Sequence, residues 1–131
     1  MSNTSADNTF RFSPPIDSRY LIDLYAGDYI MIGETFSDVL MEYDDFVRHI
    51  NTCYEQGDRT ALKSAVHKIK PLFGFVGLLT LQADCQDFEN TCMQSDAGIL
   101  ASSFNSLNDK LLKIRTVIET EKNRLQQFNN G

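Results

Sequence analysis

Two histidines are the residues of this chain best suited to nucleophilic or metal-binding chemistry, and they stand in different surroundings. His49 has one further candidate ligand at helical spacing, Cys53, and a structural zinc site needs a full tetrahedral set, so we expect no metal site. His67 instead has a lysine one helical turn away on each side, Lys63 and Lys70. An exposed imidazole can act as a nucleophile, and ammonium groups can offset the charge of a phosphoryl group. His67 is therefore the candidate for anion or phosphoryl chemistry.

The apolar residues around His67 predict a helix and fix the direction in which the imidazole points. They recur at steps of four and three in one stripe: Leu62, Val66, Ile69, Phe73 and Val76. On a helical wheel that starts at Leu62, His67 lies at about 140°, Lys70 at about 80° and Gly74 at about 120°. His67 therefore faces outward, beside a bare patch of backbone at Gly74. An ordinary lysine-rich surface with a solvated histidine has the same geometry, so the pattern alone leaves both interpretations open.

Apolar stripes of this kind cover four long segments of the chain: residues 28–54, 58–76, 78–92 and 97–125. Gly57 and Gly77 interrupt the pattern between segments, and Asp58 and Asp96 are suitable N-caps for the segments that follow them. Such helices bury their stripes against one another. We therefore expect an all-α fold, an antiparallel four-helix bundle.

Length, composition and charge limit the class of protein. The 131 residues fit one domain over residues 16–128, with a short capping helix that ends near residue 25 and a flexible N-terminal tail over residues 1–15. Twelve Lys and Arg against eighteen Asp and Glu give a formal net charge of −6, which argues against nucleic-acid binding. The longest uncharged stretch, residues 71–83, is too short for a membrane-spanning helix. Three cysteines in a chain that can bury a core indicate reduced thiols in the cytoplasm, and the net charge and filled stripes favour a monomer.

The order of residues around His67 resembles that of the histidine-containing phosphotransfer (HPt) domain of phosphorelays. That family carries an aliphatic residue and a lysine two and three positions after its histidine, and here these are Ile69 and Lys70. A glycine, an aliphatic residue and a hydrophobic–acidic pair follow at the family's spacing: Gly77, Leu81, Phe88 and Glu89. The resemblance covers residues 16–125.

The resemblance implies that His67 accepts a phosphoryl group on Nε2 from a receiver-domain aspartate and passes it to another receiver in a multi-step His–Asp relay. The partners would be response-regulator receiver domains or a hybrid sensor kinase. Glu89 would accept a hydrogen bond from Nδ1, and Lys70 would stabilise the phosphoryl group, with Lys68 and Lys63 as weaker candidates. The chain has no phosphate-cradling glycine loop for ATP. We therefore expect a carrier rather than an enzyme, with no cofactor of its own and with Mg²⁺ bound by the receiver.

Pro71 departs from the family pattern, which usually has a small residue four positions after the histidine. A proline there removes the backbone hydrogen bond to the His67 carbonyl, so we expect a kink or loosened turn. This turn, with Gly74 and Gly77, would set the backbone of the site and the access to it. A helical module that docks receiver domains or other signalling proteins without carrying phosphate is the alternative function. Outward apolar residues that could form a docking patch are Ile30, Met41 and Phe75.

Overall fold

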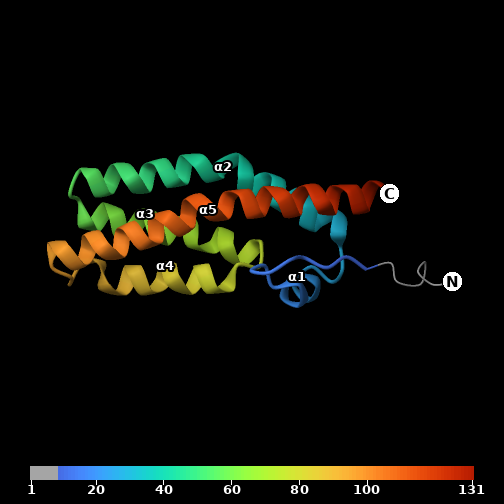
Figure 1. Cartoon of the computed structure of the whole chain (residues 1–131), viewed down its shortest axis with the longest axis horizontal. Helices are drawn as coiled ribbons and strands as arrows, with labels where there is room; N and C mark the ends of the chain where they lie inside the picture. Colours follow the sequence, from blue (N-terminus) through green and yellow to red (C-terminus); the bar gives the residue numbers. More distant parts are fainter. Residues whose placement is uncertain (1–8) are drawn as a thin grey trace.

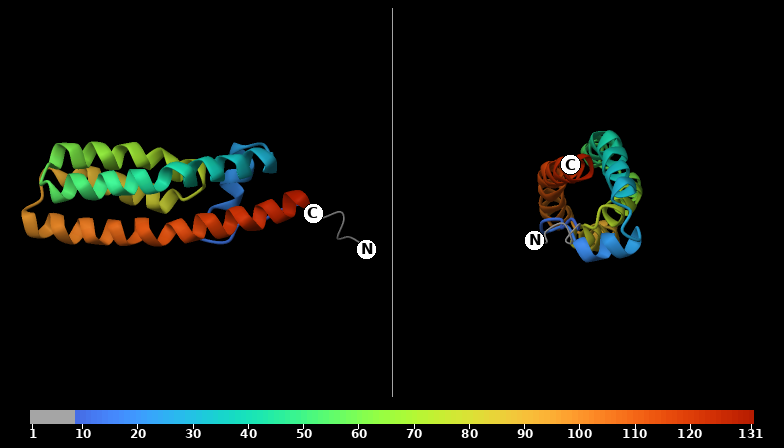
Figure 2. Two further views of the ribbon diagram at one scale, coloured as in Figure 1. Left: turned by 90° about the horizontal axis from the view of Figure 1, so that it is seen from above. Right: turned by 90° about the vertical axis from the view of Figure 1, so that its right-hand side faces the viewer.

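Five α-helices follow the apolar segments of the sequence in the computed structural model, which describes residues 9–131. In chain order they are α1 (Ser18–Leu24), α2 (Tyr29–Glu55), α3 (Arg59–Phe75), α4 (Leu79–Cys92) and α5 (Ala97–Asn130). Residues 9–131 contain no β-strand, which confirms the predicted all-α class. The four long helices lie side by side as a helical bundle, with α2 and α4 each packed against both α3 and α5 (Figure 1, Figure 2). No helix within residues 9–131 combines the length and the apolar content needed to cross a membrane.

Local signals in the sequence set where these helices begin and end. Four helices begin after an aspartate whose side chain accepts a hydrogen bond from a backbone N–H of the first turn: Asp17, Asp28, Asp58 and Asp96. Gly57 (φ +70°) and Gly77 (φ +73°) adopt left-handed backbone in the α2–α3 and α3–α4 turns. The predicted breaks at both glycines, and the caps predicted at Asp58 and Asp96, are confirmed.

The stripes meet in a core that also holds polar and thiol groups. Tyr43 is almost fully buried, and its hydroxyl donates to the Leu111 carbonyl oxygen at 2.6 Å. Burial raises the pKa of Tyr43 above its ordinary value. All three cysteines are free and buried, and burial raises the pKa of Cys85 to about 12. The Cys85 thiol therefore stays protonated near neutral pH and acts as a packing residue.

The expectation of a flexible tail is wrong for residues 9–15. Phe10 and Phe12 are buried in the core, and the Phe12 ring stacks on Phe36 with centroids 5.3 Å apart. The Ser13 backbone N–H donates to the buried Glu121 carboxylate on α5 at 2.6 Å. This segment therefore packs between α2 and α5, because its aromatic side chains find apolar partners far away in the sequence. The remainder of the predicted tail, residues 1–8, lies outside the described residues.

Helix α1 lies against the turn between α3 and α4, and α2 and α5 extend past this turn (Figure 1). The Asp17 N–H donates to the Gly77 carbonyl oxygen at 2.8 Å, and the Tyr25 hydroxyl donates to the Phe75 carbonyl oxygen at 2.9 Å. A Cβ added at Gly77 would lie 2.8 Å from Leu21 Cγ. The turn therefore has no room for a side chain on the face that α1 covers.

We expect Gly77→Ala to lower the free energy of unfolding by about 2 to 4 kcal/mol, because it adds left-handed backbone strain to a steric clash. Gly57→Ala is the matched control, since Gly57 has a similar φ but no atom within 4 Å of an added Cβ. It should lose only the backbone contribution, about 1 to 2 kcal/mol. Urea unfolding of both variants measures the difference. Equal losses in the two variants would show that the contact with Leu21 has no energetic weight.

Candidate functional site

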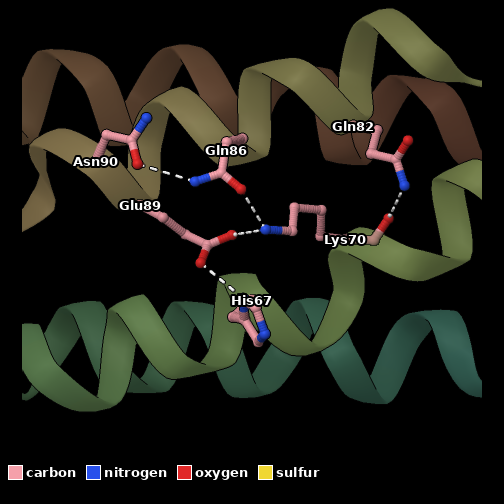
Figure 3. Close-up of polar contacts among 6 residues, drawn as sticks. All are labelled: His67, Lys70, Gln82, Gln86, Glu89 and Asn90. Carbon is pink, nitrogen blue, oxygen red and sulfur yellow. Dashed lines mark hydrogen bonds and ion pairs between the residues drawn. The ribbon is translucent and has the colours of Figure 1, made fainter.

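His67 and Glu89 face each other across the α3–α4 interface. His67 lies ten residues before Gly77 and Glu89 twelve residues after it, so the turn sets both at about the same height along the bundle. Nδ1 of His67 lies 2.8 Å from Oε1 of Glu89 (Figure 3). The His67 side chain is 66% exposed and that of Glu89 only 6%. An ionised carboxylate can only accept, so this contact favours a proton on Nδ1, and in the neutral imidazole that tautomer has its lone pair on Nε2.

Lys70 contacts the other oxygen of the same carboxylate. Its Nζ lies 2.8 Å from Glu89 Oε2, and only 16% of the lysine side chain is exposed. The geometry at Oε2 is that of an ion pair rather than of a directed hydrogen bond. The buried charge of Glu89 is thus balanced by a cation from α3.

Two residues of α4 that the sequence analysis did not single out complete this polar cluster. The Lys70 ammonium donates to Gln86 Oε1 at 2.5 Å, and Gln86 Nε2 donates to Asn90 Oδ1 at 2.9 Å (Figure 3). Gln86 and Asn90 are four residues apart, so they share one face of α4. The only sign of this cluster in the sequence is the four-residue spacing of two polar side chains beside Glu89. That spacing does not show which residue of α3 lies opposite Gln86.

The bare patch expected at Gly74 does not exist. Gly74 is buried, and a Cβ added there would lie 2.8 Å from Nε2 of Gln82, whose amide covers this position. The same Nε2 donates to the Lys70 carbonyl oxygen at 3.4 Å. Helix α3 continues from Arg59 to Phe75 through Pro71, so the expected loosening at the proline does not interrupt the helix. Gly77 acts on the site only indirectly, through the turn.

The remaining candidates are exposed, and the three docking candidates do not lie beside His67. Lys63 and Lys68 are both exposed on α3. The three docking candidates are 58%, 81% and 48% exposed: Ile30, Met41 and Phe75 respectively. A helix rises about 1.5 Å per residue, so distances along the bundle can be counted from the α2–α3 turn. Counted in this way, Met41 lies about 9 Å further from the turn than His67, and Ile30 lies about 25 Å further than His67. Phe75 lies about 12 Å along α3 from His67, because the helix continues through Pro71.

No group of three or more His, Cys, Asp or Glu side chains in residues 9–131 is placed to hold a metal ion. Nε2 of His49 lies 3.7 Å from the sulfur of buried Cys53, and this pair stands without further ligands in the described chain.

A family model described as the Hpt domain matches residues 34–127, well over half of the 131-residue chain. No curated protein and no solved structure matches the chain.

Proposed function

Because the chain belongs to the Hpt domain family, we propose that it is a histidine phosphotransfer protein that carries a phosphoryl group on His67 between receiver domains of a His–Asp relay. Membership in the family supports a part in phosphorelay signalling and a carrier role. The observation that carries the assignment to His67 is its contact with Glu89, 2.8 Å from Nδ1 to Oε1, on a largely exposed imidazole. The four long helices form, in this proposal, the antiparallel four-helix bundle that presents this imidazole.

The proposed transfer is one displacement at phosphorus. The Nε2 lone pair attacks the phosphoryl group of a receiver aspartyl phosphate, so a P–N bond forms as the bond from phosphorus to the carboxylate oxygen breaks. The carboxylate leaves with the electron pair, and the Nδ1 proton of His67 stays in place. Positive charge develops on the ring, and the Glu89 carboxylate that accepts from Nδ1–H stabilises it. Reversal of the same step passes the group to the next receiver.

The rest of the machinery is assigned to the partner. In this proposal Mg²⁺ is held by the receiver domain of a response regulator or hybrid kinase, and this chain binds no cofactor. The domain comprises residues 16–128 together with the packed residues 9–15. Three free, buried cysteines are in keeping with the cytoplasm. The net charge of −6 favours a monomer.

The test is phosphate uptake from a receiver domain that has been phosphorylated with acetyl phosphate, read as the intact mass of this chain. We expect an increase of one phosphoryl group that is lost in acid, as a phosphoramidate should be. Binding to several receivers without uptake from any of them would favour the alternative, a helical docking module that does not carry phosphate. If the chain neither binds nor takes up phosphate from any receiver of a panel, both functions are contradicted.

Replacing Lys70 tests the electrostatic part of the proposal. We expect Lys70→Ala to slow transfer by about tenfold while the affinity for the receiver changes less than about twofold, because the lost charge acts within the site. Lys113→Ala, which removes an exposed lysine on α5, is the control and should have little effect on either quantity. Single-turnover transfer at saturating receiver separates the two quantities. A loss of affinity alone would contradict an electrostatic role for Lys70.

A further inference from the structure

We propose that Gln86 is a positioning residue of the phosphotransfer site, which holds the Lys70 ammonium against the buried Glu89 carboxylate. The inference rests on the proposed function and deepens it, because it assigns a task to a residue of α4 whose side-chain hydrogen bonds go to Lys70 and Asn90 rather than to His67.

Glu89 needs a cation other than His67. Its side chain is 6% exposed, and its two oxygens face different residues, with Oε1 toward His67 and Oε2 toward Lys70. Without Lys70, the buried carboxylate could be balanced only by a second proton on the imidazole or by its own protonation. A doubly protonated imidazole has no lone pair with which to attack phosphorus. Lys70 beside Glu89 therefore allows a neutral, nucleophilic His67 to coexist with an ionised acceptor.

Lys70 alone does not fix its ammonium at this point. A lysine side chain is a flexible stem that carries a point charge, and its contact with Oε2 lacks the direction of a hydrogen bond. Within residues 9–131, the directed bond of its Nζ is the one to Gln86 Oε1 at 2.5 Å. The ammonium is thus located by the amide and attracted by the carboxylate (Figure 3).

Gln86 is itself oriented. Its side chain is exposed and would sample several rotamers, but its Nε2 donates to Asn90 Oδ1 one turn further along α4. With the NH₂ group turned toward Asn90, the carbonyl oxygen of the amide is the atom that faces Lys70. The row Asn90–Gln86–Lys70–Glu89–His67 therefore runs from an exposed edge of α4 to the proposed nucleophile.

The experiment compares Gln86→Met, which keeps the length but removes the acceptor, with Gln86→Glu, which keeps an acceptor oxygen. Gln126→Met on the exposed face of α5 is the matched control. Two quantities are measured in each protein: solvent exchange of the Lys70 ammonium protons by NMR without phosphate, and the single-turnover rate of transfer from a phosphorylated receiver. We expect Gln86→Met to speed the exchange and to slow transfer by about three- to tenfold, the range that follows from one lost hydrogen bond. The affinity for the receiver should be unchanged, and Gln86→Glu should restore slow exchange.

The exchange measurement distinguishes a failure of the role proposed for Gln86 from a failure of the proposed carrier function. A Lys70 ammonium that exchanges freely in the wild type, or equally slowly in Gln86→Met, would overturn the inference. So would faster exchange without any change in the transfer rate. If the wild-type protein accepts no phosphate, the carrier function fails, and the exchange measurement alone still decides whether Gln86 holds Lys70.

Discussion

Phosphate uptake should be abolished in His67→Gln, so that the phosphorylated species falls to the background of the mass measurement. Glutamine has no ring nitrogen with a free lone pair, so no P–N bond can form at this position. Its amide NH₂ can still donate to Glu89, and the side chain it replaces is 66% exposed. The free energy of unfolding should therefore change by no more than about 0.5 kcal/mol. Urea unfolding and receiver binding, measured alongside uptake, separate loss of the nucleophile from loss of the fold.

His49→Gln is the matched control for this variant, because His49 is the other histidine of the chain and is exposed on α2. It should take up phosphate as the wild-type protein does. Undiminished uptake in His67→Gln, or its loss in His49→Gln alone, would refute the assignment of His67 as the phosphorylated residue.

Removing the Glu89 side chain should produce the second large effect. We expect Glu89→Ala to slow transfer by about 10- to 100-fold, because a hydrogen bond to a charged group contributes about 1.5 to 3 kcal/mol. The variant loses the acceptor that keeps the proton on Nδ1, and it leaves Lys70 without its anionic partner. Single-turnover transfer from a phosphorylated receiver is the measurement, with urea unfolding to record the cost of the unpaired, largely buried lysine.

Two companion variants sharpen this result. Glu89→Gln keeps a carbonyl oxygen that can accept from Nδ1–H but loses the charge, so its rate should fall between those of wild type and Glu89→Ala. Asp87→Ala removes an exposed carboxylate of the same helix that forms no ion pair within residues 9–131, and it should transfer at the wild-type rate. If Glu89→Ala and Asp87→Ala behave alike, Glu89 has no part in the transfer.

The helices could be predicted from the sequence because their signals are local. A stripe with steps of three and four, an aspartate before it and a glycine after it lie within one segment, and the structure has them where the pattern indicates. The packing of residues 9–15 could not be predicted in the same way. Phe10 and Phe12 are stabilised by partners on α2 and α5, and a short aromatic segment rich in polar neighbours carries no sign of such distant contacts.

In the site, too, local features could be predicted from the sequence, whereas contacts between helices could not. The family resemblance, which the Hpt match over residues 34–127 confirms, singled out His67, Lys70 and Glu89. A helical wheel alone put His67 and Lys70 on one side of α3, but the ion pair of Lys70 with Glu89 depends on the register between α3 and α4. For the same reason, a wheel shows Gly74 as open backbone, whereas Gln82 from the neighbouring helix covers it.

The ties between α1 and the α3–α4 turn bear on where this module can be cut and still work. The family match begins at residue 34, yet the Asp17 N–H and the Leu21 side chain hold Gly77 from upstream of that point. A fragment trimmed to the match would also uncover Phe36 and leave the Glu121 carboxylate without the Ser13 donor. Since the turn sets the register between His67 and Glu89, the shortest fragment that keeps this register begins at residue 9. Fusions and chimaeras of this Hpt domain should therefore be joined ahead of Phe10.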